Sequence, residues 1–146
     1  MTRPTHLFFY GVLREDISAF GADWPFLEGL GLGAPATTMG ALYAIPNGGT
    51  WYPALIPTQA RYAVPVHGTI HEAGAVDLAA IDAFEGPDYE RQDLEIAGWD
   101  GFGEATAQVY VWISDLPDGA VAIPHGDFIQ WLEETGNRPL SEISDR

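Results

Sequence analysis

The sequence contains no cysteine, no lysine and only 6 arginines, against 21 aspartates and glutamates among 146 residues. Without cysteine, the protein can form no disulfide, no thiolate nucleophile and no cysteine-ligated zinc site. Six scattered arginines in a chain of net charge −15 cannot form the basic stripe on which binding to nucleic acid or to an anionic membrane surface depends. We therefore expect neither nucleic acid nor a membrane as a partner.

Long apolar runs are also missing. The longest early run covers residues 7–13, ends at Arg14, and is too short to cross a bilayer. The 17 glycines and 11 prolines are too few for a disordered chain, and the 47% of apolar residues can supply a packed core. We expect a cytoplasmic protein with a single domain over residues 1–136 and a loosely held tail over residues 137–146.

Short strands outnumber helices in the predicted secondary structure. Helices are predicted over residues 77–85 and 127–135, each followed by a glycine, and Asp23 is expected to cap a short helix that opens at Trp24. Strands are predicted over residues 6–10, 39–45, 54–56, 64–70, 93–96 and 106–113. The strands do not alternate regularly with helices. This pattern favours an α+β fold, with an antiparallel or mixed sheet that curls into a small barrel flanked by short helices.

The first stretch that could carry chemistry is Tyr10-Gly11-Val12-Leu13-Arg14, where a predicted strand breaks at glycine. Glycine permits backbone angles at which consecutive N–H groups can point into a concave site. Such groups can bind an anion or a developing oxyanion. The alternative is an ordinary exit from a strand into a loop.

The second stretch is the end of the helix predicted over residues 77–85. Its last residue, Glu85, follows Phe84 and precedes Tyr89. The helix dipole disfavours a negative charge there, and aromatic neighbours remove water from it, so the sequence predicts a raised pKa for Glu85. A raised pKa suits a general base that works near neutral pH. The alternative is a solvated carboxylate, one of the 21 acidic side chains.

Two further patterns are weaker. His67 and His71 lie four residues apart on a predicted strand, which separates their Cα atoms by about 13 Å and is too far for one metal ion. Residues 29–34 fit the loose glycine pattern of dinucleotide-binding loops. They follow no predicted strand, and the acidic residue expected about 20 positions later is missing. We predict no metal and no cofactor.

Taken in order, these stretches resemble the gamma-glutamylcyclotransferase-like superfamily, and specifically its gamma-glutamylamine cyclotransferase-like branch. The resemblance spans roughly residues 6–128 and departs from the family at Val12, where a small hydroxyl residue is usual. The matching motifs are Phe9-Tyr10-Gly11-Val12-Leu13-Arg14, Gly40-Ala41-Leu42-Tyr43, Tyr52-Pro53-Ala54-Leu55, Val66-His67-Gly68-Thr69-Ile70, and the signature Ile81-Asp82, Glu85-Gly86, Tyr89 and Arg91.

The resemblance implies a small mixed barrel and an intramolecular aminolysis. The α-amine of a γ-glutamyl group attacks its own side-chain carbonyl, which closes pyroglutamate and releases an amine. Glu85 would act as the general base and general acid, and backbone N–H groups of Gly11, Val12 and Leu13 would hold the substrate and its oxyanion. No metal or cofactor is implied.

The resemblance also implies a set of substrate-binding side chains. Tyr10, Tyr89 and Tyr110 would form walls of the site, and Arg14 or Arg91 would neutralise a substrate carboxylate unless both pair with surface acids. The expected partner is a small γ-glutamyl compound. A non-catalytic module that binds a small molecule on the same fold is the alternative function.

The net charge of −15 bears on the substrate. A strongly acidic protein repels anions and attracts cations over about 10 Å at ordinary salt. Glutathione is an anion at neutral pH, whereas a γ-glutamyl amine is not. We therefore expect γ-glutamyl amines to be preferred over glutathione.

Overall fold

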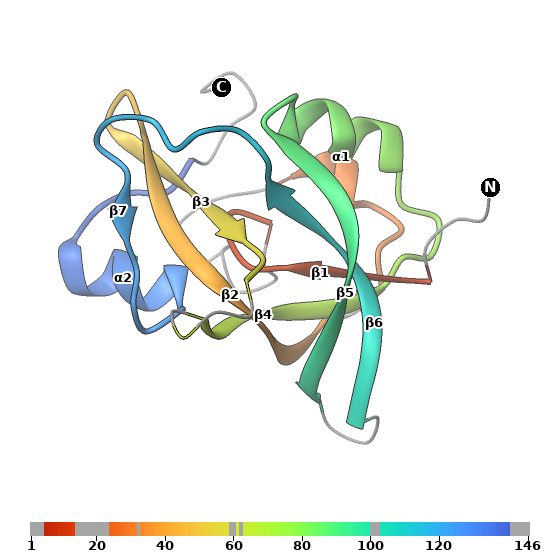
Figure 1. The fold of residues 1–146 in the computed structure, drawn as a ribbon. Coiled ribbons are helices and arrows are strands. Elements are labelled where there is room, and N and C mark those ends of the chain that lie inside the picture. Colours follow the sequence, from red (N-terminus) through yellow and green to blue (C-terminus); the bar gives the residue numbers. More distant parts are fainter. Residues whose placement is uncertain are drawn as a thin grey trace.

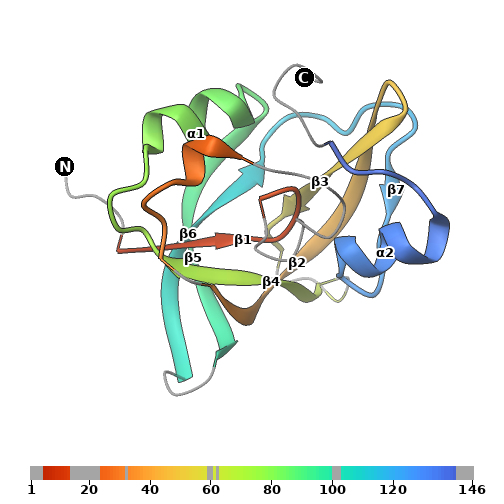
Figure 2. The same ribbon diagram turned by 180° about the vertical axis from the view of Figure 1, so that it is seen from behind.

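A computed structural model describes residues 5–13, 24–31, 33–58, 61, 63–99 and 103–140. Within these residues, seven strands form one sheet, five of which close into a barrel (Figures 1 and 2). A single pairing, Thr37 with Ala97, joins the fifth barrel strand back to the first. In order around the barrel the strands are β2 (Ala34–Asn47), β4 (Val64–Glu72), β1 (His6–Phe9), β6 (Gly103–Trp112) and β5 (Tyr89–Trp99).

The remaining elements lie outside this ring. β3 (Thr50–Ile56) and β7 (Val121–Ala122) both pair with β2. Two helices, α1 (Leu78–Glu85) and α2 (Phe128–Thr135), lie on opposite sides of the barrel, and a short 3₁₀ helix, η2 (Pro25–Leu27), lies next to α1 (Figures 1 and 2). β1 runs parallel to β6, and the other strand pairs are antiparallel. The predicted α+β fold with a small mixed barrel and short flanking helices is confirmed.

β2 is twice the predicted length because it pairs with two partners in succession. Its first half, from Ala34 to Gly40, pairs with β4, and its second half, from Ala41 onward, pairs with β3. At the changeover, a Cβ on Gly40 would lie 2.6 Å from a methyl carbon of Leu55, so a side chain here would require Leu55 to move. The prediction started the strand only at Met39, because the preceding residues lack an apolar pattern.

α1 begins and ends where the sequence indicates. The side chain of Asp77 caps it by accepting from the Ala80 N–H at 3.1 Å, and the N–H of Gly86 closes the last turn on the Asp82 carbonyl. Its apolar face carries Phe84, which packs on Trp24 with ring centroids 4.8 Å apart. The short helix predicted at Trp24 is η2, and its predicted cap, Asp23, lies outside the described residues.

The first residues of the predicted tail are attached to the sheet. The N–H of Trp51 donates to the Arg138 carbonyl, and the N–H of Leu140 donates to the Trp51 carbonyl. Leu140 is fully buried. The expectation of a loosely held tail is therefore wrong for residues 138–140, because their backbone pairs with β3, and residues 141–146 lie outside the described residues.

Among the described residues, neither α1 nor α2 has the length and apolar character that crossing a bilayer requires.

Candidate functional site

A pocket of about 350 Å³, including its open mouth, lies where β1 ends and α1 ends. It brings together seven of the predicted site residues, which lie far apart in the sequence. Its lining residues are Phe8, Phe9, Tyr10, Gly11, Val12, Leu13, Tyr52, Pro53, Glu85, Tyr89 and Tyr110. Most of this wall is apolar or aromatic.

Glu85 is the charged residue among those that line the pocket. It is the last residue of α1, as predicted, and its side chain is half-buried. The preceding Phe84 packs against Trp24 and Phe26, with ring centroids 4.8 and 5.2 Å away. This aromatic cluster anchors the last turn of α1, so the carboxylate is carried on a rigid support.

Tyr10 supports the pocket from behind. Its hydroxyl donates to the Tyr110 carbonyl at 2.6 Å and accepts from the Leu55 N–H at 3.1 Å. Burial, together with the charge of Glu85, raises the pKa of Tyr10 well above its usual value. The hydroxyl therefore stays protonated, and it ties β3 to β6 behind the pocket wall.

The hydroxyls of the other two predicted tyrosines are also engaged as donors. Tyr89 donates to the Pro53 carbonyl at 2.5 Å, and Tyr110 donates to Asp82 at 2.5 Å. Burial and the hydrogen bond to Asp82 raise the pKa of Tyr110 far above its usual value. Both phenols shape the wall, and that of Tyr110 stays protonated near neutral pH.

Gly11 is needed for a reason other than the one predicted. Its φ is not positive, so its backbone angles are open to other residues. A Cβ at Gly11 would instead lie 1.9 Å from Cγ of Pro53, which leaves no room for any side chain. The turn that follows is fixed by Trp24, whose indole N–H donates to the Val12 carbonyl at 2.6 Å. Close packing positions this turn.

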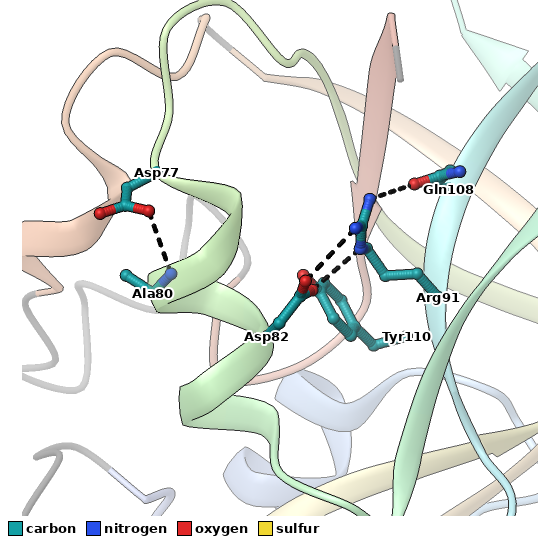
Figure 3. A network of polar contacts seen from close by, with 6 residues as sticks. All are labelled: Asp77, Ala80, Asp82, Arg91, Gln108 and Tyr110. Atoms are coloured by element: carbon teal, nitrogen blue, oxygen red, sulfur yellow. Dashed lines mark hydrogen bonds and ion pairs between the residues drawn. The ribbon is translucent and has the colours of Figure 1, made fainter. Parts of the chain in front are cut away.

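Arg91, one of the two predicted arginines, does not line the pocket. Arg91 donates from Nε and Nη2 to Asp82, at 2.8 and 3.3 Å, and from Nη1 to Gln108 at 2.5 Å (Figure 3). Its guanidinium is thus engaged by side chains of the protein itself, which was the alternative left open by the sequence. Arg14 lies outside the described residues.

Sequence reasoning assigned no site role to five residues that the structure places at or beside the pocket: Phe8, Phe9, Tyr52, Pro53 and Asp82. Tyr52 and Pro53 of β3 line it directly. Asp82 binds Tyr110 from the helix side. The signals were present, because Tyr52-Pro53 belongs to one of the family-like motifs and Asp82 precedes Glu85 by three residues. What the sequence did not show is that β3 packs against the end of β1.

His71 takes part in internal hydrogen bonds rather than in a metal-binding pair with His67. Its Nδ1 lies 2.8 Å from the Gly31 carbonyl, and its Nε2 lies 3.0 Å from Oγ1 of Thr69. His71 is buried, whereas His67 is exposed. The two rings therefore do not converge on one point.

Solved structures share this fold at low sequence identity. An AIG2-like protein from Mus musculus matches with a TM-score of 0.59 and 21% identity over 80% of this chain and 82% of that one. YkqA from Bacillus subtilis matches with a TM-score of 0.61 and 17% identity over 92% of this chain, which spans 43% of that protein. A Kluyveromyces lactis allophanate hydrolase matches with a TM-score of 0.65 and 13% identity, over 91% of this chain and 22% of that one.

Sequence comparison identifies a family. No curated protein matches the chain. Residues 7–131, which contain all the lining residues of the pocket, match the family described as gamma-glutamyl cyclotransferase, AIG2-like. The chain therefore belongs to the gamma-glutamyl cyclotransferase, AIG2-like family.

Proposed function

We propose that the protein is an enzyme that converts a γ-glutamyl amine into pyroglutamate and a free amine. The observation that supports this most is the position of Glu85, a single carboxylate at the edge of an otherwise uncharged pocket beside the turn of Gly11, Val12 and Leu13. A carboxylate that can both accept and return a proton is the one side-chain group that such a cyclisation requires.

In the proposed reaction, the α-amine of the substrate attacks the side-chain carbonyl carbon of the same γ-glutamyl group. The new C–N bond closes a five-membered lactam, and the bond from that carbon to the leaving amine breaks. The α-ammonium nitrogen loses two protons as it becomes the lactam N–H. Glu85 takes one of them and delivers it to the leaving nitrogen, and the released amine takes up the other to become an ammonium ion. No net proton, water or electron is consumed.

The aromatic wall of the pocket suits a cyclisation within one molecule. Because the nucleophile and the carbonyl belong to one molecule, the main task is to hold the substrate bent, with the reacting atoms about 3–3.5 Å apart. The walls from Tyr10, Tyr89 and Tyr110 are each fixed by a hydrogen bond to the protein, so they can impose that conformation without rearranging. In this proposal, backbone N–H groups of residues 11–13 bind the developing oxyanion.

The test is to incubate the protein with a panel of γ-glutamyl amines and γ-glutamyl peptides, while measuring both product formation and ligand binding. We expect pyroglutamate from at least one γ-glutamyl amine. Binding of these compounds without any product would instead support a small-molecule binding module. Neither binding nor turnover across the panel would reject γ-glutamyl compounds as the ligands.

A further inference from the structure

We propose that Asp82 is a positioning residue, which holds Glu85 in place by fastening the last turn of α1 to the strands β5 and β6. The inference rests on the proposed function, since it assigns a role around the same pocket. Asp82 does not line the pocket itself. Its effect would therefore be exerted through the residues that it binds.

Although Asp82 is exposed, its carboxylate accepts several hydrogen bonds. Its side chain is 44% exposed, yet it accepts from Arg91 Nε at 2.8 Å, from Arg91 Nη2 at 3.3 Å and from the Tyr110 hydroxyl at 2.5 Å (Figure 3). Two donors from one guanidinium fix the orientation of a carboxylate as well as its distance. The partners come from two different strands, so Asp82 is attached to the barrel wall.

The strand side of this contact is itself rigid. Arg91 and Tyr110 are directly opposite each other in the antiparallel pair of β5 and β6. Arg91 also donates from Nη1 to Gln108, two residues before Tyr110, at 2.5 Å. Asp82, Arg91, Tyr110 and Gln108 thus form a connected set of contacts, which we call the Asp82 clamp. It links α1 to both β5 and β6.

The Asp82 clamp lies next to Glu85 both along α1 and across the pocket. Along α1, Asp82 precedes Glu85 by three residues, and side chains at this spacing occupy the same face of a helix. Across the pocket, the Tyr110 ring that Asp82 holds is part of the lining that contains Glu85. Glu85 also raises the pKa of Tyr110, which indicates that the two groups are close. Loosening Asp82 would therefore change the distance between Glu85 and the opposite wall.

A purely structural role predicts a different result from a positioning role. Exposed ion pairs contribute little to folding stability. A displacement of about 1 Å at a catalytic group can slow a reaction about 100-fold. A positioning residue in this place should therefore affect kcat far more than it affects the unfolding midpoint.

The experiment compares Asp82→Asn with Asp77→Ala, two changes on the same helix. Asp77 caps α1 from the far end and contacts neither Arg91 nor Tyr110 (Figure 3). We expect Asp82→Asn to lower kcat roughly 10- to 100-fold with KM changed less than about 3-fold and the unfolding midpoint nearly unchanged. Asp77→Ala should lower the midpoint and leave kcat within about 2-fold of the wild type.

Tyr110→Phe gives a second measurement, because it removes one donor of the clamp and keeps the aromatic wall. If Asp82 acts through Tyr110, the double variant with Asp82→Asn loses less than the product of the two single effects. A wild-type kcat for Asp82→Asn would overturn the proposal. So would a parallel fall in kcat and unfolding midpoint for both Asp82→Asn and Asp77→Ala.

Failure of the proposed function would show itself separately, as a wild-type protein that forms no pyroglutamate. The clamp is then tested by the crystal structure of Asp82→Asn. A shift of Glu85 relative to Tyr110 by about 1 Å or more supports positioning. An unchanged distance between them contradicts it.

Discussion

The two helices, α1 and α2, have the same local construction but different roles in the molecule. Each has eight residues, an aspartate cap whose side chain accepts from the third helical N–H, and a glycine after its last residue. α1 buries only Ile81 and Phe84. α2 buries four large side chains, Phe128, Ile129, Trp131 and Leu132. The same local signals can therefore produce a helix that stabilises the core and a helix that presents polar groups.

The acidic residues of α1 and α2 also differ in what they contact. On α1, Asp82 binds the barrel strands and Glu85 faces the pocket. On α2, Glu134 pairs with His125 at 2.7 Å on the surface, where such a pair has little effect on stability. α1 thus buries fewer side chains than α2 and places acidic side chains against the strands and the pocket. The predictions below separate the two roles.

The largest effect is expected at the end of α1. Glu85→Gln keeps the shape of the side chain and removes the proton acceptor, so kcat should fall roughly 100- to 10,000-fold while ligand binding persists. The matched control is Glu133→Gln, at an exposed position of α2. Steady-state kinetics with calorimetric binding would measure both. Near-full activity of Glu85→Gln would show that another group transfers the proton.

The largest effect on stability is expected on α2. Leu132 is almost fully buried, so Leu132→Ala should reduce the free energy of unfolding by about 2–5 kcal/mol. Because α2 lies away from the pocket, kcat measured below the unfolding transition should stay at the wild-type value. Denaturant titration gives the first quantity and kinetics the second. A fall in kcat at temperatures where the variant is fully folded would link α2 to the site.

The helix caps should have smaller and nearly equal effects. Asp77 and Asp127 accept cap hydrogen bonds at 3.1 and 3.2 Å, so Asp77→Ala and Asp127→Ala should each cost about 1 kcal/mol of folding stability. Thermal unfolding of the two variants side by side would check this. A much larger loss for Asp127→Ala would mean that its other contacts, and not capping, dominate.

The smallest effect is expected from ionic strength. The net charge of −15 should raise kcat/KM for a γ-glutamyl amine that carries a second, positively charged amine, and lower it for glutathione. Raising salt from about 0.01 to 0.1 M shortens the screening length from about 30 to 10 Å, so the advantage should shrink several-fold. Rates that do not depend on salt, or faster turnover of glutathione, would contradict this.

Local signals in the sequence predicted two parts of the site. Gly86 and the apolar spacing before it predicted that a helix ends at Glu85, and the structure confirms that end. The break after the first strand likewise placed Tyr10 and Gly11 correctly beside a concave site. The contacts that end α1 lie within a few residues along the chain, whereas Tyr10 and Gly11 contact residues of other strands.

Parts that depend on long-range pairing could not be predicted from the sequence. Gly11 is required by Pro53, which comes from another strand. The partners of Arg91 depend on the register of β5 with β6 and on how α1 docks against them. The attachment of Leu140 depends on an exposed edge of β3 at Trp51. A single sequence carries no local sign of any of these.

The most direct test of the proposed cyclisation is the identity and stoichiometry of the products that the wild-type protein forms from a γ-glutamyl amine. Mass spectrometry or proton NMR can follow both products in one reaction. We predict pyroglutamate and the free amine in equal amounts, with no free glutamate. Glutamate in place of pyroglutamate would show that water, and not the α-amine, attacks the carbonyl, and would contradict the proposal.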